Sequence, residues 1–286
     1  MKKGLVMEGG AMRGMFTCGV IDVLMENNIT FDSAVGVSAG ATFGCNIKSK
    51  QIGRGIRYNK KYCNDKRYAS LGSFIKTGDI YNVPFCYDTL PYELDKWDID
   101  AFYTNPMDFY CVATSLSTGD AVYHKCDNYE TAPGGQDITW IRASASMPVV
   151  SRPVEIDGSL YLDGGMADSI PLQFMESQNC DKILVIETQP ASYVKKPQKF
   201  MWLIKKVLRK YPNMIKTMQN RHNMYNAQKD YVRSQASDGN VFVIRPQAPL
   251  NIGATEKDPS ELQRVYDLGR TEAIHNIKAL KAYLSA

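Results

Sequence analysis

The chain has 286 residues and a net charge of +4, with 44% apolar and 22% charged residues, as in a globular protein with a sizeable core. No stretch approaches the ~20 apolar residues of a transmembrane helix, and the N-terminus lacks the pattern of a signal peptide. Seven cysteines without a C-x-x-C pair are typical of reduced thiols, so we expect a cytoplasmic protein without a disulfide framework or zinc site.

Along the chain, apolar runs and helical periodicity alternate. Strands are predicted at 4–7, 33–37, 108–116, 121–125, 182–188 and 241–246, and helices at 13–27, from 38 onward, at 137–146 and at 258–284. Residues 50–105 have no clear period and are expected to form helices and loops over a site. This alternation predicts an α/β fold with a mostly parallel sheet. Without an internal repeat or a recognisable linker, we expect a single domain spanning residues 1–286.

A serine stands at one strand-to-helix junction, in the sequence GVSAG at 36–40. This G-x-S-x-G pattern presents a nucleophile, Ser38, on a sharp turn where Gly36 and Gly40 leave room for tight packing. The helix that follows adds partial positive charge, which favours a developing anion. A structural turn or an N-cap serine would give the same five residues, so the motif alone does not establish catalysis.

A glycine-rich turn, GGAMRG at 9–14, follows the first predicted strand. Its backbone amides have little side-chain obstruction, which suits an oxyanion hole for acyl transfer. A nucleotide-phosphate loop would need G-x-G-x-x-G or G-K-[ST], and neither is present. Arg13 either steadies this loop or attracts an anionic head group, and a solvated helix-start residue is the alternative.

The base that would activate Ser38 is the next question. The three histidines, His124, His222 and His275, do not lie in glycine-flanked loops, and we expect structural or solvated roles for them. Asp163 precedes two glycines in YLDGG, where the backbone can fold tightly around another loop. Partial burial would raise the pKa of this carboxyl and make it a workable base.

Together the three motifs, in this order, resemble the patatin-like phospholipase family. The block ASASMPVV at 143–150 and Pro171 also fit, and the resemblance covers roughly residues 4–190. It implies a three-layer α/β/α sandwich and a lipid acyl hydrolase that works through an acyl-enzyme, without metal or cofactor. Ser38 would be the nucleophile and Asp163 the base, and the oxyanion hole would be formed by residues Gly9, Gly10, Ala11, Arg13 and Gly14. Ala11 departs from the family pattern, which commonly has a third glycine there.

Two other functions remain open. A lipid- or acyl-binding protein could keep this fold without catalysis, although binding alone does not require the serine, the aspartate and the glycine loop together. A Ser-His-Asp esterase would instead depend on one of the histidines.

A basic segment follows the region of resemblance. From Lys195 to Arg221 there are nine Lys or Arg and no acid, which leaves the rest of the chain net negative. Within it, residues 199–211 place apolar and basic side chains on opposite faces of a predicted helix, which could rest on an anionic membrane or pack on the core. The apolar face would consist of Phe200, Leu203, Ile204, Val207, Leu208 and Tyr211. No basic-aromatic module accompanies the segment, so we do not expect nucleic-acid binding.

Overall fold

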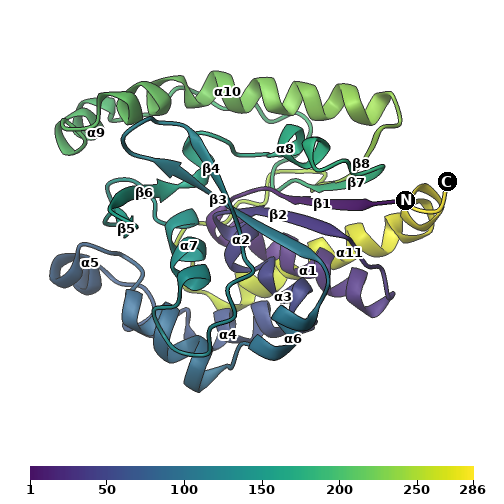
Figure 1. Cartoon of the computed structure of the whole chain (residues 1–286), viewed down its shortest axis with the longest axis horizontal. Coiled ribbons are helices and arrows are strands. Elements are labelled where there is room, and N and C mark those ends of the chain that lie inside the picture. Colours follow the sequence, from purple (N-terminus) through teal and green to yellow (C-terminus); the bar gives the residue numbers. More distant parts are fainter.

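An eight-stranded mixed sheet forms the centre of the protein in a computed structural model that describes residues 1–286 (Figure 1). The strands are β1 (Lys3–Met7), β2 (Ser33–Val37), β3 (Asp108–Ser115), β4 (Ala121–Lys125), β5 (Val154–Ile156), β6 (Ser159–Asp163), β7 (Lys182–Ile186) and β8 (Val241–Ile244). Their order is β5-β6-β3-β2-β1-β7-β8, and β4 pairs with β3. The run from β3 to β8 is parallel, whereas β4, β5 and β6 pair antiparallel. The predicted mostly parallel α/β sheet is confirmed.

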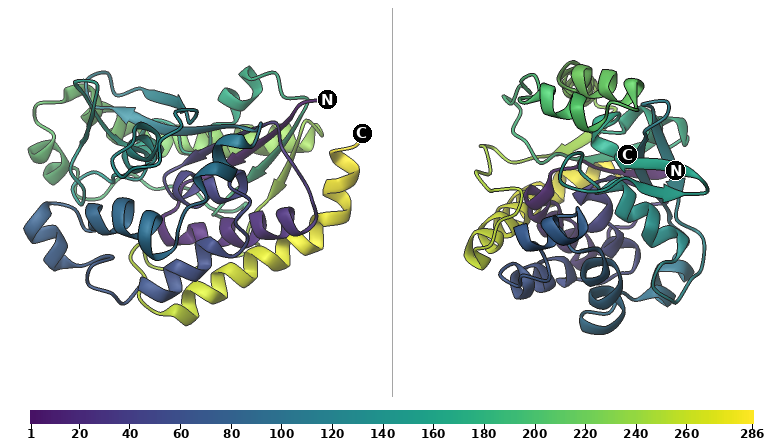
Figure 2. Two further views of the ribbon diagram at one scale, coloured as in Figure 1. Left: turned by 60° about the horizontal axis from the view of Figure 1, so that its bottom comes forward. Right: turned by 90° about the vertical axis from the view of Figure 1, so that its left-hand side faces the viewer.

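Helices cover both faces of this sheet (Figures 1 and 2). The α-helices are α1 (Gly14–Glu26), α2 (Ala39–Thr42), α3 (Cys45–Lys48), α4 (Arg54–Tyr62), α5 (Leu71–Thr77), α6 (Ile99–Thr104), α7 (Gln136–Ser144), α8 (Leu172–Ser177), α9 (Met201–Val207), α10 (Pro212–Ser237) and α11 (Pro259–Tyr283). The chain also contains two 3₁₀-helices, η1 (Ala11–Arg13) and η3 (Gly164–Met166), and one π-helix, η2 (Pro84–Leu94). Helices α8, α9 and α10 lie on one side, and α1, α3, α4, α6 and α11 lie on the other, which gives the three-layer sandwich (Figure 1).

The alternation of side chains along the strands builds two separate cores. In β1, Leu5 and Met7 belong to the larger core on the α1 and α11 side, whereas Val6 belongs to the core under α8 and α10. Both faces of a parallel strand are buried here, which explains the nearly continuous apolar runs in the sequence.

The helix predicted at residues 199–211 is shorter than expected. Phe200 has a left-handed backbone with φ of 60°, the helix α9 ends at Val207, and α10 begins at Pro212. A residue before proline avoids the α conformation, so the two helices cannot run on as one. The predicted apolar face is also divided, because Ile204 and Leu208 are buried in a small core whereas Phe200 and Val207 are exposed.

No helix in the structure combines the length and the apolar character needed to cross a bilayer.

Candidate active site

Ser38 occupies a strained turn between β2 and α2. Its φ of 54° and ψ of −116° lie outside the regions that L-residues normally adopt, at a cost of about 1–3 kcal/mol. The chain closes tightly around this turn, since a Cβ at Gly40 would lie 2.2 Å from the carbonyl oxygen of Met7. A Cβ at Gly36 would likewise meet the Gly40 carbonyl oxygen at 2.2 Å. The two elbow glycines are therefore required by close backbone approach.

Strand β3 brings Asp163 to this serine. Val37, just before Ser38, is opposite Val112, and Asp163, the last residue of β6, is opposite the adjacent Ala113. The Ser38 hydroxyl donates a hydrogen bond of 2.6 Å to Oδ2 of Asp163. The second oxygen, Oδ1, accepts from the backbone N–H of Gly165 at 2.8 Å. Residues separated by 125 positions thus form one buried pair, with Ser38 8% and Asp163 3% exposed.

The surroundings of Asp163 act on its charge in opposite directions. Burial raises the pKa of the carboxyl, and this is the dominant effect. The hydrogen bond from Ser38, the Arg221 guanidinium, the Gly165 N–H and the Lys195 ammonium each lower that pKa. The net result is a carboxyl that is more basic than an aspartate in water and that nearby cations still favour in its ionised form.

The glycine-rich turn lies against the serine. A Cβ at Gly9 would approach Cβ of Ser38 to 3.1 Å and the Val37 carbonyl oxygen to 3.0 Å. The structure contains no hydrogen bond from the amides of Gly9, Gly10 or Ala11 to another protein atom. These three N–H groups, at the end of β1, therefore have no partner within the protein.

Two residues expected in the same hole use their amides differently. The N–H of Arg13 donates to the Gly10 carbonyl at 3.0 Å, and the N–H of Gly14 donates to the Ala11 carbonyl. These bonds form the single turn of η1, so Arg13 and Gly14 shape the loop with their amides. Ala11 itself has a φ of 47°, the left-handed region in which glycine is favoured.

One residue beside Ser38 makes a contact that the sequence did not predict. Ser144, at the end of α7, accepts a hydrogen bond of 2.9 Å from the backbone N–H of Ser38 through its Oγ. Both groups are buried, so the bond satisfies a donor that the tight turn leaves without a helical partner. The ASASMPVV block contains Ser144, but nothing in its pattern distinguishes this serine from Ser146.

A largely apolar cavity of about 130 Å³ lies beside Ser38. Seventeen of its 25 lining residues are hydrophobic. Ala11 and Ser38 line it, together with Ile141 from α7 and Tyr87 and Leu90 from η2. Such a space suits an apolar group better than a polar one. The prediction that residues 50–105 form helices and loops over a site agrees with their place in this wall.

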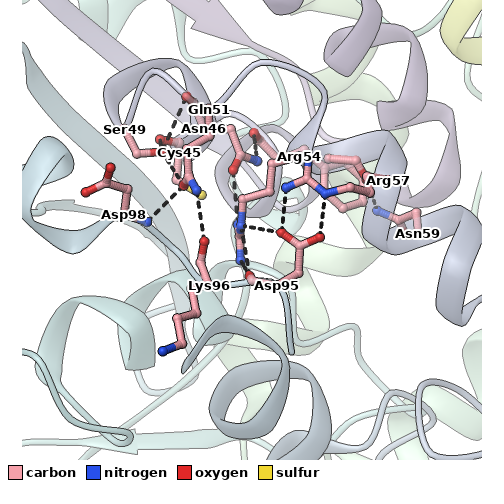
Figure 3. A network of polar contacts seen from close by, with 12 residues as sticks. Cys45, Asn46, Ser49, Gln51, Arg54, Arg57, Asn59, Asp95, Lys96 and Asp98 are labelled. Carbon is pink, nitrogen blue, oxygen red and sulfur yellow. Dashed lines mark hydrogen bonds and ion pairs between the residues drawn. The ribbon is translucent and has the colours of Figure 1, made fainter. Parts of the chain in front are cut away.

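A polar network fixes part of the cavity wall (Figure 3). Arg54, which lines the cavity, donates to Oδ1 of Asn46 at 3.0 Å and through Nη2 to the Asp95 carbonyl at 2.8 Å. Arg57 holds the Asp95 carboxylate with two hydrogen bonds of 2.8 Å. These contacts anchor the segment that follows η2 to α3 and α4.

The histidines take no part in this site. His124 hydrogen bonds to Asp137 at 2.7 Å and stacks on Trp140, His222 lies on α10, and His275 is exposed on α11. None of the three hydrogen bonds to Ser38 or Asp163.

The one group of side chains with metal-ligand character lies around His124. Its imidazole, the Cys126 thiol and the Asp137 carboxylate have ligand atoms within 4.8 Å of one another. The Asp137 oxygens already accept hydrogen bonds from His124, Tyr103 and Asn128. These contacts account for the cluster as a hydrogen-bonded network under β4.

A serine on a strained strand-to-helix turn, a hydrogen-bonded carboxyl and an apolar cavity are typical of the serine acyl hydrolases. A sequence model of the family described as "Patatin-like phospholipase" matches residues 5–175, and one described as "Domain of unknown function (DUF6363)" matches residues 211–285. The first match spans more than half of the chain. The chain therefore belongs to the patatin-like phospholipase family and is an enzyme of the lipid-hydrolase class.

The chain is also similar to individual proteins. The chain is 28% identical over 93% of its length to the uncharacterized protein YjjU of Escherichia coli, of which it covers 74%. It is 27% identical to lysophospholipase nte1 of Aspergillus niger and 25% identical to an uncharacterized NTE family protein of Mycobacterium tuberculosis. These two matches use 64% of the chain but span only 12% and 30% of the respective relatives. The crystal structure of VipD from Legionella pneumophila gives a TM-score of 0.48 at 12% identity, over 97% of this chain and 67% of that one.

Proposed function

We propose that the protein hydrolyses acyl esters of lipids through Ser38 and Asp163, with an acyl-enzyme intermediate. The observation that carries this proposal is the buried 2.6 Å hydrogen bond from the Ser38 hydroxyl to the Asp163 carboxylate, beside an apolar cavity. Because the lysophospholipase relatives are much longer than this chain, their substrate does not transfer directly. A lipid ester with one acyl chain in the cavity is the substrate that the site itself favours.

The reaction follows from the positions of these groups. Asp163 takes the hydroxyl proton as Oγ of Ser38 forms a bond to the acyl carbon, and the carbonyl oxygen becomes an oxyanion. The free amides of Gly9, Gly10 and Ala11 stabilise this charge. The carbon–oxygen bond to the alcohol then breaks, and the departing oxygen takes the proton back from Asp163. In the second half, water gives a proton to Asp163 as its oxygen attacks the acyl carbon. The bond from that carbon to Oγ then breaks, Oγ takes the proton back from Asp163, and the fatty acid is released.

Hydrolysis of a long-chain monoacyl phospholipid by purified protein tests this function. The wild-type protein should release fatty acid, and Ser38→Ala should lose that activity while it remains folded. Ser33→Ala, in the same β2 strand, is the matched control because the buried Ser33 hydroxyl has no hydrogen-bond partner. Equal turnover by the wild-type and Ser38→Ala proteins would exclude the proposal.

We also propose that the whole chain acts as one domain, which includes the C-terminal region outside the patatin match. Strand β8 extends the sheet by pairing with β7, and α11 packs on α1 through two reciprocal glycine contacts. A Cβ at Gly19 would lie 2.1 Å from the Tyr266 carbonyl oxygen, and a Cβ at Gly269 would lie 2.1 Å from that of Phe16. A chain truncated before β8 should therefore fail to fold, whereas independent unfolding of the two regions would contradict a single domain.

We propose that α9 contacts an anionic bilayer. Phe200 and Trp202, which are separated by one residue in the chain, are 69% and 68% exposed, and Val207 is 52% exposed. Exposed lysines, Lys205 and Lys206, lie on the same helix, as on a helix that rests on anionic lipid. Helix α5 lies at the same end of the molecule (Figures 1 and 2) and exposes Leu71 and Ile75.

Tryptophan fluorescence can test this contact directly, because Trp97 and Trp140 are buried and Trp202 is the exposed tryptophan. Vesicles containing phosphatidylglycerol should shift the emission to shorter wavelength, and Trp202→Phe should remove that shift. The same response to neutral phosphatidylcholine vesicles, or no response to either kind, would exclude the electrostatic contact. The cytoplasmic location expected from the cysteine pattern stays a prediction.

A further inference from the structure

Three cations without ion-pair partners lie near one another beside Asp163 of the candidate active site. They are Arg13 at the end of η1, Lys195 in the loop between β7 and α9, and Arg221 on α10. None of them has a carboxylate within 4 Å, although eleven ion pairs occur elsewhere in the protein. The buried Nε of Arg13 has no hydrogen-bond partner at all.

Contacts with neighbouring residues hold Lys195 and Arg221 in place. Lys195 donates its N–H to Oδ1 of Asn226 at 2.8 Å and accepts from Nδ2 of the same residue at 3.0 Å, which ties the loop to α10. Its ammonium lies over the Tyr225 ring, 4.5 Å from the centroid. The Nε of Arg221 donates to the Gly165 carbonyl at 2.6 Å, next to Asp163. The remaining guanidinium donors of Arg221 have no partner in the protein.

The charges of this group are unfavourable without an anion. Three effects, burial first and then repulsion from Arg221 and from Arg13, lower the pKa of Lys195 to about 8. Attraction from Glu8 and Asp163 acts in the opposite direction but does not offset them. Lys229 provides a comparison, because it is a buried lysine whose charge is paired within the protein. That ammonium is more deeply buried than the half-buried Lys195, and it pairs with Glu187 at 3.1 Å and also donates to two carbonyls.

The position of the cluster relative to the cavity indicates its ligand. Helix α10, which carries Arg221, covers one face of the sheet, whereas α4, which lines the cavity, lies on the other side (Figure 1). Ala11 lines the cavity, and Arg13 is two residues further on in the same turn. An ester bound at Ser38 with its acyl chain in the cavity would direct its alcohol portion towards the cations.

We propose that Lys195 and Arg221, with Arg13, bind the phosphate of an anionic acyl-glycerophosphate, so that the C-terminal region supplies the head-group site of the enzyme. This inference rests on the proposed function for the placement of the acyl chain. It assigns to residues outside the patatin match the choice between phosphate-bearing lipids and neutral acylglycerols.

Binding to the Ser38→Ala protein tests the head-group site without requiring activity. Calorimetry should show that oleoyl lysophosphatidate binds at least 10-fold more tightly than monooleoylglycerol, as expected for charge-assisted hydrogen bonds. Lys195→Gln should weaken the anionic lipid about 10-fold, and Lys195→Arg should restore it. Lys196→Gln, at the exposed neighbouring position, is the matched control and should keep the preference.

The outcomes separate this inference from the proposed function. Equal affinity for the two lipids, or a preference that survives Lys195→Gln, would overturn the head-group site even if Ser38 is catalytic. If the anionic lipid binds preferentially but the wild-type protein hydrolyses neither lipid, the head-group site is upheld and the catalytic proposal is rejected. Glycerol phosphate should bind at least 10-fold more weakly than the lysolipid, and equal binding would assign the site to a soluble phosphoester and overturn the lipid assignment.

Discussion

Replacing Asp163 by asparagine removes the proposed base with almost no change in shape. The Gly165 N–H needs an acceptor and therefore orients the amide oxygen towards itself, which leaves the Nδ2 donor facing Oγ of Ser38. The serine hydroxyl then has no group to receive its proton. Loss of a positioned base slows a reaction by about 10²–10⁴-fold, or about 3–5 kcal/mol of activation free energy. Hydrolysis of p-nitrophenyl butyrate measures this loss.

The same substitution should increase the free energy of unfolding at pH 7, although it lowers activity. Burial raises the pKa of Asp163 in the folded protein above its unfolded value of about 3.8. The protonated carboxyl therefore contributes its full stability below pH 3.8, and this contribution is lost as the pH rises through the folded pKa. Asp163→Asn, which is always neutral, should therefore be more stable than the wild-type protein at pH 7, with the difference shrinking towards pH 4. Asp157→Asn, at the exposed turn of the same hairpin, is the control and should change neither property. An Asp163→Asn protein that keeps a tenth or more of the wild-type kcat/KM would refute the assignment of the base.

Three further changes test individual parts of the site. Ala11→Gly should relieve the left-handed strain and increase the free energy of unfolding by about 0.5–1 kcal/mol in urea titrations, and a decrease would contradict the strain. Ser144→Ala should lower it by about 1–3 kcal/mol because the buried Ser38 N–H loses its acceptor, so an unchanged midpoint would argue against that bond. As Lys195 loses its proton near pH 8, the rate ratio of anionic to neutral substrates should fall between pH 7 and 9, and Lys195→Arg should abolish that fall. A pH-independent ratio in the wild-type protein would speak against an ammonium in the head-group site.

The sequence predicted the parallel part of the sheet well, for a physical reason. Strands such as β1 and β7 are buried on both faces, so their apolar runs stand out from the helices between them. The antiparallel hairpin of β5 and β6 was missed because β6 has only two buried residues and β5 is a three-residue strand at the edge of the sheet.

The long helix α10 was missed as well. Only five of its 26 residues are buried, and they form a narrow stripe with no wide apolar face to reveal it. Its start at Pro212 is a recognisable signal for a first helical turn. The consequence is functional, since Arg221 and its contact with the Gly165 carbonyl were also missed.

The residues at the elbow could be predicted because close packing restricts them to small side chains, and glycine patterns record that restriction. The bond from the Ser38 amide to Ser144 and the cluster of Lys195, Arg13 and Arg221 could not. These contacts join segments from distant parts of the chain, and only the crossing of strands and helices brings them together.

The rate at which a fluorophosphonate probe labels Ser38 tests the central pairing most directly, because labelling requires an activated hydroxyl but no particular lipid. Mass spectrometry should place the adduct on Ser38 in the wild-type protein and show labelling slowed at least 100-fold in Asp163→Asn. The triple variant His124→Gln, His222→Gln and His275→Gln should label at a rate close to that of the wild type. Undiminished labelling in Asp163→Asn, or its loss in a folded histidine variant, would contradict the pairing of Ser38 with Asp163.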